Sequence, residues 1–128
     1  MNLLVALYNA VSLTHVLCCG AVDLDKVMPP LTFRYACPTD TFIDMGAAAG
    51  EDPKDPPKPG EVVYADDRHV LCQRWNWRQD ARSAISPATR RAVITLQGNG
   101  IGHGEAAADD LTRLLRDLLQ SSSADISR

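Results

Sequence analysis

Apolar residues recur at helical spacing near both ends of the chain. Leu3, Leu4, Leu7 and Val11 repeat at intervals of three and four residues, which predicts a core helix that begins almost at Met1 without an N-terminal cap. A second helix is predicted near the C-terminus, where acidic residues precede the basic ones, as the helix dipole prefers. Its apolar stripe consists of Leu111, Leu114, Leu115, Leu118 and Leu119.

Several short segments between these helices have the composition and alternation of strands. Residues 31–36 alternate like a half-buried strand, and 41–45 is the expected hairpin partner. Residues 61–65 and 70–77 are predicted to pair across a turn at Asp66-Asp67 as a second hairpin. A last strand is predicted at 92–96.

The remaining segments indicate loops and turns. Residues 46–60 are rich in proline and glycine and have almost no bulky apolar side chain, so a surface loop is expected. Ser86-Pro87 is typical of a helix start. Residues 98–104 predict a flexible connector, since the spacing of a phosphate-binding loop is not met. The whole pattern predicts one domain over residues 1–120 and a flexible tail over 121–128.

The composition is that of a soluble globular protein, with 45% apolar and 23% charged residues in 128 positions. A net charge of −3 argues against general nucleic-acid binding. Between residues 68 and 91, however, six arginines accompany only one carboxylate, Asp80. They either form a local basic face that can bind an RNA segment, or are solvated side chains paired with neighbouring acids. The arginines are Arg68, Arg74, Arg78, Arg82, Arg90 and Arg91.

The cysteines and histidines are not spaced like metal ligands, so no metal and no cofactor are expected. All four cysteines are interpreted as reduced, buried thiols of a cytoplasmic chain. The apolar N-terminal stretch fits neither a signal peptide nor a membrane span, and no membrane partner is expected. A thiol nucleophile is one interpretation of Cys72, with His15 or His69 as its base; a packing residue is the other.

The segment from Arg74 to Arg78 concentrates two tryptophans, two arginines and Asn76. As part of a strand it would place Arg74, Asn76 and Arg78 on one face and both tryptophans on the other. The polar face would then suit a carboxylate or phosphate. The alternative is structural: the tryptophans fill the core while the arginines bond to nearby carbonyls or acids.

Several motifs in order carry a family resemblance. The helix motif Asn9-Ala10-Val11-Ser12-Leu13 is followed by Asp23-Leu24-Asp25, then Pro59-Gly60-Glu61-Val62-Val63, and then Cys72-Gln73-Arg74-Trp75-Asn76-Trp77-Arg78. Together they resemble the B3/B4 domain of the phenylalanyl-tRNA synthetase beta subunit, and more closely the stand-alone B3/B4 domain proteins. The resemblance implies an α+β fold with a mainly antiparallel sheet flanked by helices. Compared with such relatives, the chain is expected to lack a preceding N-terminal stretch.

The resemblance also implies tRNA or aminoacyl-tRNA as the partner, with no DNA expected. One hypothesis is hydrolysis of mischarged aminoacyl-tRNA; the alternative is a non-catalytic module that binds tRNA, an amino acid or a protein. The predicted site residues are Asn9, His15, Cys72, Arg74, Trp75, Asn76, Trp77 and Arg78. Two synthetase features are missing. Gly20 stands where the synthetase has a histidine, and residues 75–80 replace its glycine-rich loop with a glutamate.

Overall fold

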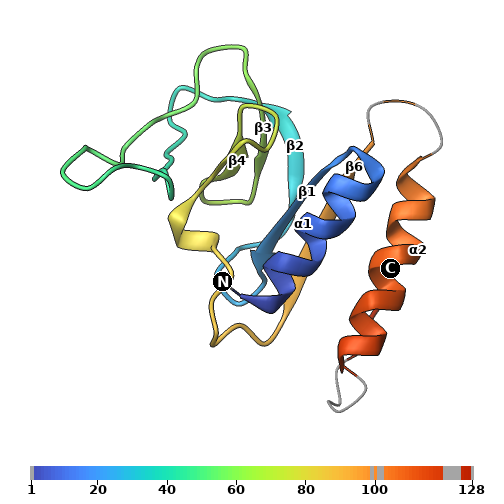
Figure 1. The fold of residues 1–128 in the computed structure, drawn as a ribbon. Coiled ribbons are helices and arrows are strands. Elements are labelled where there is room, and N and C mark those ends of the chain that lie inside the picture. Colours follow the sequence, from blue (N-terminus) through green and yellow to red (C-terminus); the bar gives the residue numbers. More distant parts are fainter. Residues whose placement is uncertain (1, 99, 101–102, 120–124, 128) are drawn as a thin grey trace. The chain divides into compact units, whose positions relative to one another are not determined.

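The structure is a computed structural model that describes residues 2–98, 100, 103–119 and 125–127. It has an α+β fold in which helices accompany antiparallel strands (Figure 1). The chain divides into two compact units. One contains residues 1–20 and 94–128, and the other contains residues 21–93.

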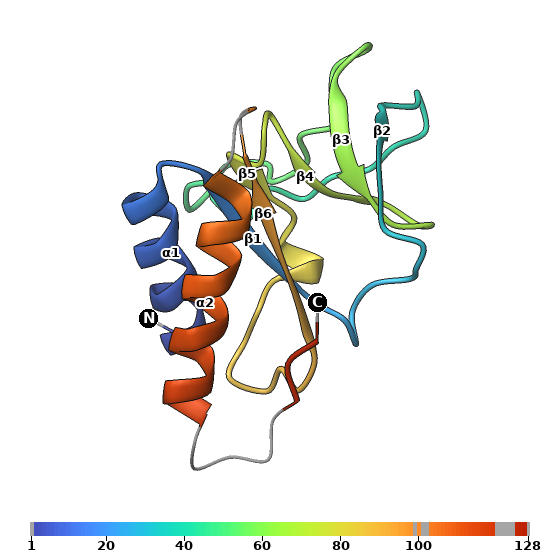
Figure 2. The ribbon, with the colours of Figure 1, turned by 90° about the vertical axis from the view of Figure 1, so that its right-hand side faces the viewer.

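The first unit is built on two helices, α1 (Leu3–His15) and α2 (His103–Leu119), which pack side by side (Figure 2). Both predicted helices are confirmed. The prediction that the first lacks a cap is wrong, because the side chain of Asn2 accepts a hydrogen bond from the amide of Leu4 at 2.9 Å. In α2 the buried side chains include Leu111 and Leu115 of the predicted stripe. In α1 only Val11 of the predicted apolar residues is buried, Leu3 is exposed, and Tyr8 is buried instead, which corrects the predicted core face.

Two strands continue from the first unit into the second. They are β1 (Cys18–Asp23) and β6 (Ala92–Gln97), which pair as a two-stranded sheet. Within the second unit this pairing is extended by a hydrogen bond of 2.9 Å from the amide of Leu24 to the carbonyl of Arg91. Residues 21–93 therefore begin and end close together.

The second unit contains a four-stranded antiparallel sheet in the order β2-β3-β4-β5. The strands are β2 (Thr32–Tyr35), β3 (Val62–Ala65), β4 (Val70–Gln73) and β5 (Arg78–Gln79). The predicted pairing of the third and fourth strand segments as a hairpin is confirmed.

The predicted hairpin partner of residues 31–36 is wrong. Strand β2 pairs instead with β3, although residues 36–61 separate the two strands in the sequence. Residues 41–45 form only isolated bridges. Their backbone donors are used elsewhere. The amide of Ile43 donates to the Asp80 carboxylate at 2.8 Å, and that of Asp44 donates to the carbonyl of Pro53 at 2.7 Å. The predicted loop over 46–60 contains no strand, as expected.

Apolar side chains cover both faces of this sheet. Strand β3 alternates, so Tyr64 points to one face while Val63 and Ala65 point to the other. Tyr64 pairs with Cys72 and Ala65 with Val70, which leaves a bulge at the intervening residue of β4. One cluster consists of Val22, Tyr64, Leu71 and Cys72, and the other of Phe42, Val63, Ala65 and Val70.

Ser86-Pro87 does not begin a helix, which corrects the prediction. Thr89 ties this segment into a turn instead: its amide donates to the carbonyl of Ser86, and its hydroxyl bonds both the Ser86 amide and the Asp23 carboxylate. A short 3-10 turn, η1 (Ala81–Ser83), occurs earlier and is capped by Asp80. The predicted connector at 98–104 is wrong for residues 103 and 104, which belong to α2. Residues 99, 101 and 102 of that connector and most of the predicted tail from 121 lie outside the described residues. No helix in the described part of the chain is long and apolar enough to cross a membrane.

Candidate functional site

A tight turn separates β4 from β5, so the predicted continuous strand over 70–77 is wrong. Arg74, Trp75 and Asn76 have φ angles of 53°, 56° and 61°, which place all three in the left-handed region. The chain therefore reverses, and Gln73 pairs with Arg78 across the turn. A hydrogen bond of 3.1 Å from the amide of Trp77 to the carbonyl of Arg74 closes it.

Both tryptophans of this turn are exposed. Trp75 is 80% and Trp77 71% accessible, so the alternative in which they fill the core is wrong. The guanidinium of Arg78 lies over the Trp77 ring, 4.2 Å from its centroid, in a cation–π contact. The turn thus presents two aromatic faces with a cation beside one of them.

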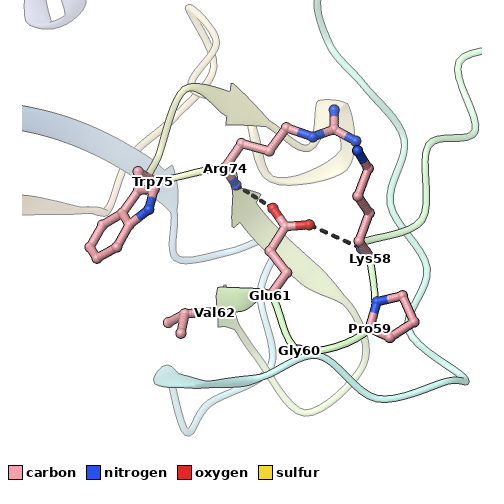
Figure 3. Close-up of a pocket in the computed structure, with 7 residues that line it drawn as sticks. All are labelled: Lys58, Pro59, Gly60, Glu61, Val62, Arg74 and Trp75. Atoms are coloured by element: carbon pink, nitrogen blue, oxygen red, sulfur yellow. Dashed lines mark hydrogen bonds between the residues drawn. The ribbon is translucent and has the colours of Figure 1, made fainter.

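Two carboxylates hold the turn through Arg74: Asp55, which lies in the long loop over residues 46–60, and Glu61, which follows that loop. One oxygen of Glu61 accepts from the Arg74 amide at 2.7 Å, and the other accepts from the Lys58 amide at 3.0 Å (Figure 3). Asp55 binds the Arg74 guanidinium through both oxygens, at 2.5 and 3.0 Å. This hydrogen bond from Arg74 is the main cause that lowers the pKa of Asp55 below its ordinary value.

A pocket of about 540 Å³ adjoins the turn. Trp75 and Val62 lie on one side of Glu61, with Lys58 and Pro59 on the other (Figure 3). The lining residues are Lys58, Pro59, Gly60, Glu61, Val62, Arg74 and Trp75. The pocket therefore combines apolar surface with charged groups of both signs.

The other arginines are mostly paired as well. Arg78 bonds to Asp44 at 3.1 Å, Arg82 to the fully buried Asp80 at 2.7 Å, and Arg91 forms an ion pair with an acid near the end of β1. Together with Arg74, four of the six arginines thus follow the interpretation in which they pair with neighbouring acids. They do not form a uniformly cationic face.

Two side-chain donors at the turn are buried without a partner. Among the described residues, Nδ2 of Asn76 and Nε of Arg78 have no hydrogen-bond acceptor. Buried polar groups are nearly always bonded in native proteins, so an unpaired donor suggests an acceptor supplied by a ligand or water. Both atoms belong to residues predicted as site residues.

Cys72 is not arranged as a nucleophile. Burial is the main cause that raises the pKa of its thiol to about 12, with the charge of Asp80 adding to the effect. No hydrogen bond joins Cys72 to a histidine within the described residues. The prediction that all four thiols are buried is correct for Cys72 and wrong for Cys18 and Cys37, which are exposed; all four are free.

The predicted site residues are divided between the two units. Cys72 and residues 74–78 come together at the end of β4 and the turn after it, in the second unit. Asn9 and His15 lie on α1 of the first unit, where Asn9 is exposed and His15 bonds to Asp110 of α2 at 3.1 Å.

Asp55, Lys58 and Glu61 were missed as site residues by the analysis of sequence patterns. They lie in or beside a loop without an apolar pattern, and they contact the turn from 13 to 19 residues away in sequence. Such contacts have no periodic signal. The one available hint is the Pro59-Gly60 turn, which places Glu61 at the start of a strand.

Within the described residues no cluster of three His, Cys, Asp or Glu side chains could hold a metal ion. This chain is an α+β domain whose fold is shared by a tRNA synthetase subunit. It belongs to the B3/4 domain family, whose model matches residues 1–101.

A solved structure has the same fold. The chain is similar to an N-terminal fragment of the phenylalanyl-tRNA synthetase beta subunit from Pyrococcus horikoshii, with a TM-score of 0.70 and 16% sequence identity. The match covers 89% of this chain and 39% of the synthetase fragment. No curated protein matches the sequence.

Proposed function

We propose that this domain binds the single-stranded 3′ end of aminoacyl-tRNA through the turn at residues 74–77. The observation that carries the proposal is the pair of exposed tryptophans, Trp75 and Trp77, on one tight turn. Unstacked bases of single-stranded RNA bind by stacking on aromatic side chains. Membership of the B3/4 domain family supports tRNA as the source of that strand.

Stacking rather than phosphate neutralisation carries the affinity in this proposal. Arg74 and Arg78 already bind Asp55 and Asp44, so their charges are largely balanced before any RNA arrives. The chain as a whole carries a net charge of −3. Binding is therefore confined to a strand whose bases can reach the turn, since a duplex offers no exposed base faces.

Hydrolysis of the aminoacyl ester is a second candidate function, favoured by the two unpaired donors. Nδ2 of Asn76 and Nε of Arg78 are buried N–H groups that an ester oxyanion could accept from. Water would be the nucleophile, because the Cys72 thiol stays protonated at neutral pH. A positioned water and donors for the developing charge are sufficient for this kind of step.

The test of binding compares three alanine variants. Trp75→Ala and Trp77→Ala remove the proposed platforms, while Tyr35→Ala removes an aromatic ring of similar exposure, 71%, from the edge strand β2 of the same unit. Affinity is measured by fluorescence anisotropy with a labelled 12-nucleotide RNA that ends in CCA. Each tryptophan variant is expected to lose about 1–3 kcal/mol of binding free energy, whereas Tyr35→Ala retains the affinity.

Equal affinity of the wild type and both tryptophan variants would refute the proposed binding mode. Deacylation is then followed with tyrosyl-tRNA(Phe) and a panel of other mischarged tRNAs. Hydrolysis that is lost in Asn76→Ala supports the second candidate. RNA binding without hydrolysis across the panel leaves a non-catalytic tRNA-binding module, and no RNA binding at all leaves a module for an amino acid or a protein.

A further inference from the structure

We infer that Glu61 and Asp55 are positioning residues, which hold the turn at 74–76 in the conformation that presents Trp75. The expected effect on RNA binding rests on the proposed function. The inference itself concerns two residues that do not stack on RNA. Neither carboxylate belongs to the turn. Both reach it through Arg74, its first residue.

The turn needs an external support because its backbone is intrinsically unfavourable. Three consecutive residues with side chains, Arg74 to Asn76, occupy the left-handed region. In that region the Cβ atom approaches the following carbonyl oxygen, so L-residues adopt it as isolated residues and rarely in succession. Of the three, only Asn76 is of a type that tolerates the conformation readily.

Glu61 supplies the support to the backbone. Its two carboxylate oxygens accept from two main-chain amides, those of Arg74 and Lys58. The side chain thereby joins the first residue of the turn to the end of the long loop, as Figure 3 shows. An amide hydrogen bond to a carboxylate is stronger than one between neutral groups, because the acceptor is charged.

Asp55 supplies the support to the side chains. It binds the Arg74 guanidinium through both oxygens, and its backbone carbonyl accepts from the side-chain amide of Gln73 at 3.0 Å. Gln73 is itself fully buried at the end of β4. The last residue of the strand and the first residue of the turn are therefore both fixed to the same loop residue.

Positioning and simple electrostatics predict opposite effects on RNA affinity. Both residues are carboxylates beside the proposed RNA-binding surface, so removing their negative charge should strengthen binding if charge alone matters. If they position the turn, removing them should weaken binding, because the tryptophan platforms are no longer held in place. The sign of the change decides between the two.

The experiment uses the full chain and the labelled RNA ending in CCA. Glu61→Ala and Asp55→Asn are each expected to weaken binding by about tenfold or more, and Glu61→Gln by less, because its one oxygen can still accept from the Arg74 amide. Asp67→Asn is the matched control: it removes an exposed carboxylate at the β3–β4 turn of the same unit and should not weaken binding. Unchanged or tighter binding by Glu61→Ala and Asp55→Asn overturns the inference.

A second measurement does not depend on RNA. Trp75 and Trp77 are the only tryptophans of the chain, so its tryptophan fluorescence reports on this turn alone. Time-resolved anisotropy should show faster local motion in Glu61→Ala and in Asp55→Asn than in the wild type, while far-UV circular dichroism stays unchanged. An identical anisotropy decay overturns the inference. If the wild type does not bind the RNA, the proposed function fails, but the anisotropy measurement still tests the positioning role. If Glu61→Ala does not fold, Glu61→Gln and Asp55→Asn test that role in its place.

Discussion

Replacement of Trp75 by glycine should leave a more stable fold than replacement by alanine, while both changes remove binding. Trp75 has a φ of 56° and an exposure of 80%, so its side chain adds little packing to a backbone that suits glycine. Glycine adopts the left-handed region without steric cost. The matched variant is Trp75→Ala, which deletes the same ring and keeps the Cβ atom that causes the clash.

The magnitude follows from two opposing terms. Relief of the left-handed conformation gains about 1–2 kcal/mol for an L-residue. The greater freedom of glycine in the unfolded chain costs roughly 0.5–1 kcal/mol. Lost packing does not enter the difference between the two variants, because both lose the same ring. Trp75→Gly should therefore be more stable than Trp75→Ala by about 0.75 kcal/mol, within a range of roughly 0 to 1.5 kcal/mol.

Urea unfolding followed by far-UV circular dichroism measures this difference, and RNA anisotropy measures binding for the same two proteins. Both variants should bind RNA equally weakly, since both lack the ring. A glycine variant that is less stable than the alanine variant would refute the reasoning, because it would mean that position 75 is not held in the left-handed region. Equal stability of the two variants would mean that the left-handed conformation at position 75 costs less free energy than its φ angle implies.

Three further outcomes are expected. Iodoacetamide at pH 8 should label the exposed Cys18 and Cys37 of the native protein and leave Cys72 unlabelled, because burial holds the pKa of Cys72 at about 12; mass spectrometry of the peptides checks this. The hydrogen bond from Arg34 holds the pKa of Asp40 below its unfolded value of about 3.9, so its stabilisation is present above about pH 4 and is lost as the pH falls through the lower folded value. Urea unfolding between pH 2 and 6 should show a smaller loss in Asp40→Asn than in the wild type, because other carboxylates with a lowered pKa, such as Asp55, still contribute to the loss in both proteins. RNA affinity should depend weakly on salt, with a slope of log K against log salt of about −1.4 or shallower, since no more than about two phosphates are neutralised; a steep slope would contradict binding by stacking.

The helices and four of the strands could be predicted because their signals are local. The apolar spacing of α1 and α2, the alternation of β2 and the strand composition of β3, β4 and β6 are signals that each segment carries by itself. The family resemblance likewise rested on motifs that occur in the observed order. Local signals therefore captured the two helices and most of the strands, but not β1, β5 or the strand that pairs with β2.

The turn at 74–77 could not be predicted, because Asn76 alone in it favours a reversal. Tryptophan is typical of strands, and the turn contains neither glycine nor proline. Its conformation is accompanied by contacts from Asp55 and Glu61, which no local pattern connects to Arg74. The residues of the candidate site were predicted from their types, but their exposure and their support were not.

The two ends of the second unit are joined by the hydrogen bond between Leu24 and Arg91. A segment that begins and ends at neighbouring points can be replaced by another without stretching the chain that flanks it. Residues 21–93, which contain the turn, its supporting loop and the four-stranded sheet, thus have the geometry of an insert. A change of ligand preference could be transferred between related chains by exchanging this one continuous segment, with α1 and α2 retained from the recipient.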